Sequence, residues 1–167
     1  MKKSSADSKL VISEVMMPSQ ANVAGNIHGG EIIKLMDSTA YAAARRFART
    51  NVVTARVDEL EFHLPIFIGD LVICTAQVVY AGRSSMEVAV NVEVEDLEHE
   101  GRQKALSAFF TMVAIDKKGR PSQVAELILD TPEEKAAFEE GKRRYEFRKA
   151  KKNPNIVCKM ECTPADE

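Results

Sequence analysis

The sequence predicts a single α+β domain in which one long apolar helix is wrapped by an antiparallel sheet. The first observation is that residues 29–47 carry apolar side chains around most of a helix, so other elements must cover it. The second is a series of long β-like segments, at residues 52–64, 71–80, 84–94 and 104–115. The third is that short turn sequences join the later segments, which indicates antiparallel neighbours.

Composition and charge fit one domain in the cytoplasm. The chain has 167 residues, of which 45% are hydrophobic, and this is enough for one core. The formal net charge of −2 and the mixed charges exclude an overall field that would attract nucleic acid or a membrane. The sequence shows neither the apolar core of a signal peptide nor an apolar run of membrane-spanning length. We expect Cys74, Cys158 and Cys162 to be reduced thiols, and no metal is predicted because no Cys/His set has ligand spacing.

The segments before and after the central helix follow from local patterns. Residues 1–8 form a polar lead that we expect to be disordered, and residues 9–16 have the pattern of a short strand. In the first β-like segment the apolar residues occupy odd positions up to Val57 and even positions from Leu60 on. This change of face predicts a bulge or strong bend near Asp58 and Glu59. The third segment alternates apolar and mostly polar residues, so one face suits a core and the other suits water or a partner.

A second helix is predicted near the C-terminus. Thr131, Pro132 and Glu134 supply an N-cap hydroxyl, a proline at the first helical position and a capping-box glutamate. The helix becomes basic toward its end, as the negative end of the helix dipole favours. We place the domain at residues 9–152 and expect a flexible tail at residues 153–167.

Two features of the central helix indicate chemistry. Gly29 and Gly30 stand where its unpaired amide groups begin, which suits an oxygen with developing negative charge, although paired glycines are also common in turns. Asp37 lies in an apolar stretch about 12 Å along the axis from Gly29, too far to attack a carbonyl held at that end. Antiparallel packing of two such helices across a dimer would bring Asp37 to the glycine end of the other copy. The alternative is that Asp37 is simply an exposed helix residue.

The combination of motifs resembles the hotdog-fold acyl-CoA thioesterases, particularly the cytosolic acyl-CoA hydrolase group. The similarity extends from about Val11 to Lys152. It is carried by A-N-V-A-G-N-I-H-G-G-E-I-I-K-L-M-D at residues 21–37, V-V-T-A-R-V-D-E-L-E-F at 52–62, G-R-S-S-M-E-V at 82–88 and S-A-F-F-T-M-V at 107–113.

This resemblance implies a hotdog fold, a long helix in a curved antiparallel sheet, with two protomers forming one continuous sheet and three dimers forming a hexamer. It implies hydrolysis of fatty acyl-CoA to free fatty acid and coenzyme A, with no separate cofactor. The catalytic asparagine falls on Asn22 and the catalytic acid on Asp37 of the opposite protomer. Thr54 matches a hydroxyl residue that helps to place the attacking water, and the amides of Gly29 and Gly30 would bind the thioester oxygen.

The resemblance also assigns contacts to coenzyme A. Arg83, Ser84 and Ser85, in a tight turn, match the family's nucleotide-contacting segment, although Ser84 also fits a solvated hairpin turn. Asn26 and His28 are further candidates for substrate contact, and both could instead order the loop. The basic end of the last helix is a second candidate for the phosphates, against the alternative of a dipole-matched soluble face.

Several alternatives stay open or are disfavoured by the sequence. Asp37 could activate water, or it could attack the thioester to give a transient anhydride. A non-catalytic acyl-CoA binder of the same fold is the competing function. A hydratase would need a D-x-N-P-x-H type of segment, and a Ser-His-Asp hydrolase would need a G-x-S-x-G elbow; the sequence has neither.

Overall fold

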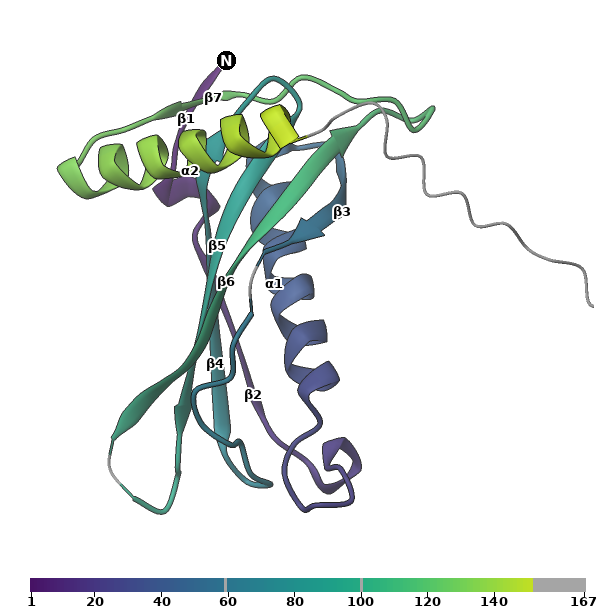
Figure 1. Cartoon of the computed structure of the whole chain (residues 1–167), viewed down its shortest axis with the longest axis vertical. Coiled ribbons are helices and arrows are strands. Elements are labelled where there is room, and N and C mark those ends of the chain that lie inside the picture. The colour runs from purple at the N-terminus through teal and green to yellow at the C-terminus, as the bar shows by residue number, and fades with distance from the viewer. Residues whose placement is uncertain (59, 100, 152–167) are drawn as a thin grey trace, which may run out of the picture.

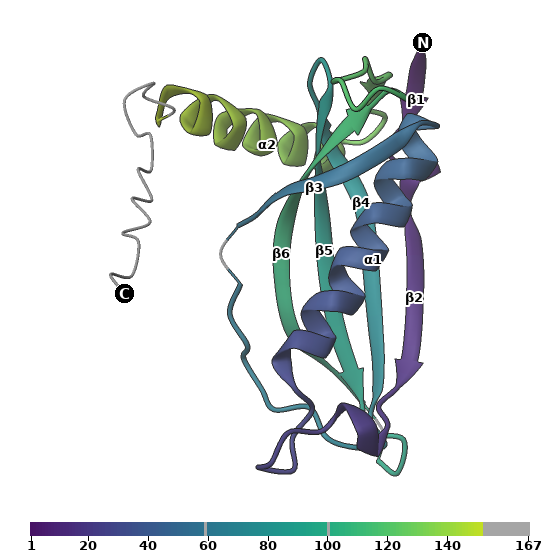
Figure 2. The ribbon, with the colours of Figure 1, turned by 90° about the vertical axis from the view of Figure 1, so that its right-hand side faces the viewer.

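The computed structural model describes residues 1–58, 60–99 and 101–151, and it shows one long helix lying against a five-stranded antiparallel sheet. The sheet curves around helix α1 (Gly29–Ala48), as Figures 1 and 2 show. The strand order is β2-β4-β5-β6-β3. The strands are β2 (Leu10–Val15), β3 (Asn51–Val57), β4 (Leu71–Ala81), β5 (Ser85–Glu95) and β6 (Arg102–Ile115). The α+β class and the meander of the later strands are therefore confirmed.

Helix α1 begins and ends at residues with clear physical signals. His28 is the N-cap, and its Nδ1 accepts a hydrogen bond from the Gly30 amide at 3.0 Å. Arg49 ends the helix in the left-handed conformation with φ 57°, and its amide donates to the Arg45 carbonyl. The residues of α1 that are buried against the sheet are Ile32, Leu35, Met36, Thr39, Ala40, Ala43, Ala44 and Phe47.

The core lies between α1 and the inner face of the sheet. In register, Val88 of β5 faces Val78 of β4 and Phe110 of β6, and all three side chains are fully buried. The alternation predicted for β5 explains this packing, since every second residue of a strand points to the same face. The inner face thus supplies the cover that the apolar helix requires.

Strand β3 is shorter than the sequence pattern predicted, and its bulge lies elsewhere. The strand ends at Val57 instead of continuing to residue 64, and its register against β6 shifts between Thr54 and Arg56 instead of near Asp58 and Glu59. Glu59 itself lies outside the described residues. Beyond Val57 only separate bonds remain, such as that from the Asp58 amide to the Phe109 carbonyl at 2.9 Å, so no regular ladder forms.

The first eight residues differ from the expected disordered lead. Strand β1 (Lys2–Ser4) pairs in parallel with β7 (Glu126–Ile128), and the short 3-10 helix η1 (Ala6–Ser8) follows. The hydroxyl of Ser5 donates to the Val78 carbonyl at 2.6 Å, and the hydroxyl of Ser8 accepts from the Val78 amide at 2.9 Å. Ser5 and Ser8 of this polar lead therefore hydrogen-bond a core strand.

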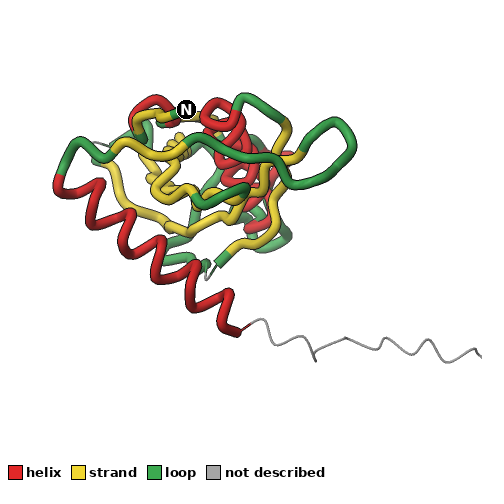
Figure 3. Tube along the Cα trace, turned by 90° about the horizontal axis from the view of Figure 1, so that it is seen from above, coloured by secondary structure: helices red, strands yellow, loops and turns green. Residues whose placement is uncertain are grey.

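The second helix, α2 (Pro132–Lys151), lies on the outer face of the sheet, opposite α1 (Figures 2 and 3). Its predicted capping box is confirmed: the Glu134 amide donates to Thr131 Oγ1 at 3.2 Å, and Glu134 Oε2 accepts from the Thr131 amide at 3.2 Å. The predicted tail, with Cys158 and Cys162, lies outside the described residues. Within the described part of the chain, neither helix is apolar enough over its length to cross a membrane.

Candidate functional site

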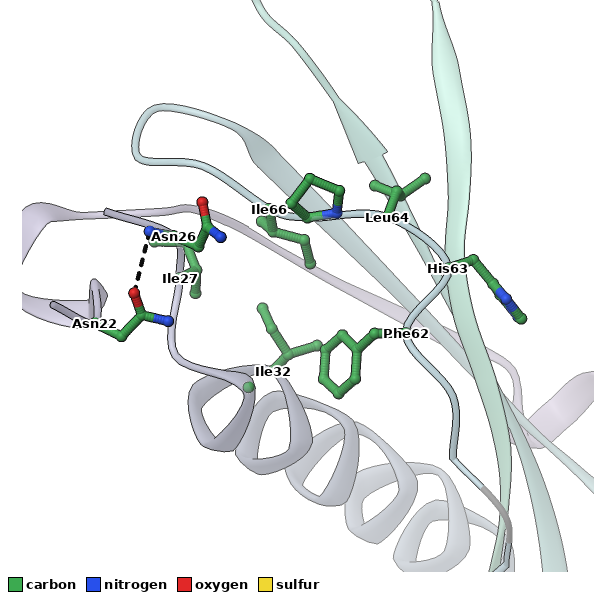
Figure 4. Close-up of a pocket in the computed structure, with 10 residues that line it drawn as sticks. Asn22, Asn26, Ile27, Ile32, Phe62, His63, Leu64 and Ile66 are labelled. Atoms are coloured by element: carbon green, nitrogen blue, oxygen red, sulfur yellow. Dashed lines mark hydrogen bonds between the residues drawn. The ribbon is translucent and has the colours of Figure 1, made fainter. Parts of the chain in front are cut away.

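The start of α1 opens onto a pocket of about 380 Å³ (Figure 4). One side of the pocket is polar, with Asn22, Asn26 and Gly29. The other side is apolar and includes Ile32 of the first helical turn and Phe62 of the segment after β3, which face each other in Figure 4. The pocket therefore combines a helix N-terminus, which attracts negative charge, with an apolar wall.

Asn22 is built into the loop that precedes α1. Its Oδ1 accepts from the backbone amides of Ala24 at 2.9 Å and Asn26 at 3.3 Å. The backbone amide of Asn22 donates to the Asn26 carbonyl at 2.7 Å. The side-chain oxygen is thus engaged, and the side-chain NH2 group is the end that can donate to a substrate. Asn22 and Asn26 both line the pocket, and their roles in substrate binding or catalysis stay predictions.

The two glycines at the helix start are not equivalent. The Gly30 amide already donates to His28 Nδ1, so His28 orders the loop and occupies one of the two amides assigned to the thioester oxygen. Gly29 lines the pocket, and the Phe62 ring lies close over it: a Cβ at this position would be 3.3 Å from the ring. Gly29 is therefore the better candidate of the two for binding a carbonyl oxygen, and any side chain there would displace Phe62.

A second group of site residues lies farther along α1. Thr54 Oγ1 of β3 donates to Asp37 Oδ1 at 2.6 Å and also lies 3.5 Å from Met112 Sδ. Asp37 is half-buried and Thr54 is exposed, so water can reach the carboxylate. Neither residue lines the pocket at the helix start. Within one chain the structure thus brings Asp37 to Thr54 but not to Asn22.

The predicted contacts to coenzyme A form a third group. The carbonyls of Arg83, Ser84 and Ser85 accept hydrogen bonds from Val124, Ala114 and Gly82, which fixes the turn. Ser85 lines a second pocket of about 720 Å³ beside the basic end of α2, whereas Arg83 and Ser84 do not line it. None of the three residues lines the pocket at the helix start.

The sequence reading missed the apolar wall of the first pocket. Phe62, Leu64 and Ile66 line it. The predicted continuous strand over residues 52–64 included Phe62 and Leu64, so they were expected to pack only as part of the sheet. Pro65 marks only the end of the predicted segment at residue 64, so it does not show that the strand stops at Val57. Across residues 1–58, 60–99 and 101–151, no three His, Cys, Asp or Glu side chains gather as a metal site.

Comparison with known proteins identifies a consistent set of relatives. The sequence profile of the thioesterase superfamily matches residues 24–99. The cytosolic acyl coenzyme A thioester hydrolase of Mus musculus is 39% identical over 137 residues, which is 81% of this chain, and this chain spans only 36% of that protein. An acyl-CoA thioester hydrolase of Escherichia coli K12 is 36% identical over 115 residues, covering 67% of this chain and 87% of the relative.

Solved structures give the same result. A hexameric acyl-CoA thioesterase without ligand superposes with a TM-score of 0.84 and 32% identity, over 89% of this chain and 96% of the other. The acyl-CoA hydrolase of Staphylococcus aureus, in complex with butyryl coenzyme A and coenzyme A, has a TM-score of 0.82 and 33% identity, over 90% and 92% of the two chains. Variants of that hydrolase in which an asparagine, an aspartate or a threonine is replaced by alanine are also similar.

Proposed function

This chain belongs to the thioesterase superfamily, and we propose that it hydrolyses fatty acyl-CoA to free fatty acid and coenzyme A in the cytoplasm. The observation that carries the proposal is the Asp37–Thr54 pair, in which the Thr54 hydroxyl of β3 holds a half-buried carboxylate of α1. The pair is separate from the pocket at the helix start, which offers hydrogen-bond donors but no acid. Hydrolysis needs both halves, because one must polarise the carbonyl and the other must supply the base or nucleophile.

A second copy of the chain completes the site. Strand β3 is the last strand of the sheet, and its Val53 and Val57 side chains are 44% and 40% exposed. An exposed apolar edge strand is suited to pairing with another strand. A two-fold axis at this edge places the α1 helices antiparallel, so that Asp37 of one copy approaches Asn22 and Gly29 of the other. The hexameric relatives support a further assembly of three such dimers.

The proposed roles rest on the hydrogen-bonding groups that each residue offers. The Asn22 NH2 group and the Gly29 amide polarise the thioester carbonyl and stabilise the oxyanion that develops on it. Thr54 orients the Asp37 carboxylate, which either takes a proton from the attacking water or attacks the carbonyl itself. Label in the Asp37 carboxylate after a single turnover in 18O-labelled water would demonstrate an anhydride that water opens at the Asp37 carbonyl. Label in the fatty acid alone is expected both for direct attack by water and for an anhydride opened at the acyl carbon. No cofactor takes part in either route.

The spacing of the variants solved for the Staphylococcus aureus hydrolase supports this assignment. The asparagine, aspartate and threonine replaced there are separated in sequence by the same intervals as Asn22, Asp37 and Thr54 here. The same three residue types at the same intervals therefore occur in both chains.

Replacing Asp37 by asparagine tests the proposal. We expect release of free thiol from palmitoyl-CoA to fall by about 10²–10⁴-fold, as is typical when an acid–base group is lost. Ser38→Ala is the matched control, because Ser38 is exposed on the same helix and has no proposed role. Light scattering should give the same mass for both variants. Unchanged turnover in Asp37→Asn would remove the basis of the mechanism.

A complementation experiment tests the shared site. An Asn22→Ala subunit and an Asp37→Asn subunit should each lose most of the activity when expressed alone. In a mixed dimer one site has both native residues and the other has neither, so co-expression should restore a substantial part of the activity. Mixed dimers without activity would show that each site is formed within one chain.

A further inference from the structure

The pocket at the start of α1 has an apolar side that the proposed catalytic roles do not use. The apolar residues that line it are Ile27, Ile32, Phe62, Leu64, Pro65 and Ile66. Ile27, Ile32 and Ile66 are buried and belong to the core, so they form a fixed wall. Phe62 differs from them because its side chain is 41% exposed in the single chain. It is therefore the large apolar side chain of this wall that can be changed without opening the core.

The Phe62 ring lies beside the proposed position of the thioester carbonyl. A Cβ at Gly29 would lie 3.3 Å from Cζ and 3.6 Å from Cε2 of the ring, so the ring edge reaches the helix start. The ring also faces Ile32 of the first helical turn, as Figure 4 shows. An acyl chain attached to a carbonyl at the Gly29 amide therefore meets the Phe62 ring close to that carbonyl.

The backbone on either side of Phe62 is held in place, although this segment is not part of a strand. The His63 amide donates to the Ala105 carbonyl of β6 at 3.0 Å, and the Ile66 carbonyl accepts from the Ile27 amide at 2.8 Å. These bonds do not involve the Phe62 side chain. Replacing Phe62 therefore changes the space in the pocket while the backbone bonds of the segment remain.

The chemistry of the lining indicates which arm of a thioester enters this pocket. Among the described residues that line it, none is Lys or Arg, so it offers no strong cation to phosphate groups. An acyl chain is apolar along its whole length, and its burial is favourable in proportion to the area removed from water. Hydrogen-bond donors beside an apolar wall therefore suit a carbonyl with its acyl chain.

We propose that Phe62 determines which acyl chain lengths this protein accepts, because its ring limits the apolar side of the pocket next to the carbonyl. The proposal rests on the proposed function, since it concerns the acyl group of the same substrate. Phe62 contacts the acyl chain and takes no part in the proton transfer. An acyl group that fits beside the ring keeps its carbonyl at Gly29. A longer one must displace the ring, so kcat/KM falls once the space is filled.

The test measures kcat/KM for straight-chain substrates from butyryl-CoA to palmitoyl-CoA in the wild type and in Phe62→Ala. We expect the ratio of kcat/KM for palmitoyl-CoA to kcat/KM for butyryl-CoA to rise by about tenfold or more in the variant. A misfit of one methylene in an apolar pocket already changes kcat/KM by about 10–200-fold. Phe62→Leu, which keeps a branched apolar side chain, should give a smaller rise.

Phe67→Ala is the matched control. Phe67 lies on the same segment and is 50% exposed, but it does not line the pocket at the helix start. Its contact with Asn26 is a backbone bridge, which alanine retains. The dependence of kcat/KM on chain length in Phe67→Ala should therefore match that of the wild type.

Two results with the active protein would overturn the proposal. An unchanged ratio in Phe62→Ala would show that the ring does not limit the acyl chain, and an equal change at every chain length would give Phe62 only a general role in the site. If the wild type hydrolyses no acyl-CoA, the proposed function fails separately. Calorimetric binding of alkyl-CoA thioethers, which cannot be hydrolysed, then decides. A shift of the tightest binding toward longer chains in Phe62→Ala supports the proposal, whereas an unchanged dependence on chain length, or no binding to the wild type, refutes it.

Discussion

Replacing Glu87 by glutamine tests whether a buried ion cluster holds α2 on the sheet. The side chain is 1% exposed, and its two oxygens accept four hydrogen bonds, of 2.6–3.0 Å, from Arg144 and Arg148. Glutamine has nearly the same shape, but it carries no charge and turns NH2 donors toward guanidinium donors. The change therefore leaves two cations without the partner that they share.

The expected loss of stability follows from burial. Removing one partner of a buried ion pair costs about 3–5 kcal/mol. Here the Arg144 and Arg148 side chains are 28% and 15% exposed, and Asp58 still pairs with Arg148 at 3.1 Å, so solvent and Asp58 offset part of that cost. We expect the free energy of unfolding to fall by about 2–3 kcal/mol. For a chain of this size, Tm should fall by about 4–12 °C.

Thermal denaturation followed by circular dichroism measures this change. The protein concentration must be the same for all variants, because Tm of an oligomer depends on it. Glu140→Gln is the matched control: this carboxylate is 62% exposed and lies 3.8 Å from Arg144, so its loss should change stability by less than about 0.5 kcal/mol. The reasoning is refuted if Glu87→Gln melts within about 1 °C of the wild type, since the cluster would then contribute no net stability.

Three further predictions follow from single positions. Gly141→Ala should lower Tm, because the new Cβ would lie 2.7 Å from Tyr80 Cβ; a rise, as the gain of about 1 kcal/mol in helix propensity alone predicts, would contradict the close packing. Burial raises the pKa of Cys74 to about 11, so the thiol stays protonated at pH 8 and should escape iodoacetamide in the native protein but not in urea, as peptide mass spectrometry can show. Thr131→Ala should lower the free energy of unfolding by about 1 kcal/mol in urea titrations, whereas Thr131→Ser should keep the cap; equal losses would exclude a role for the hydroxyl.

Much of the architecture was predictable because it depends on local patterns. Three patterns each involve residues that are close in sequence: the apolar residues around α1, the alternation in β5 and the capping box at Thr131. Each of them predicts one element. The same holds for Gly29, where a loop with free donors enters a helix, whereas Asn22 came from the family resemblance. The pairing of Asp37 with Thr54 came from the family resemblance, and the structure shows the hydrogen bond between them.

Other features depend on which segments meet in space, and local patterns do not contain that information. The alternation placed Glu87 on a face fit for water or a partner, but arginines far away in the sequence cover it and leave it 1% exposed. The position of the β3 bulge depends on the register against β6.

The sequence by itself determined most of the elements, the wrapped helix and the glycines at its start, because hydrophobic periodicity and capping act over neighbouring residues. Only the tertiary structure decided that Ser85 and the basic end of α2 share one pocket, and that the Gly30 amide is already bound by His28. Long-range packing and hydrogen-bond competition are the physical reason, since both depend on atoms that the chain brings together only when it folds.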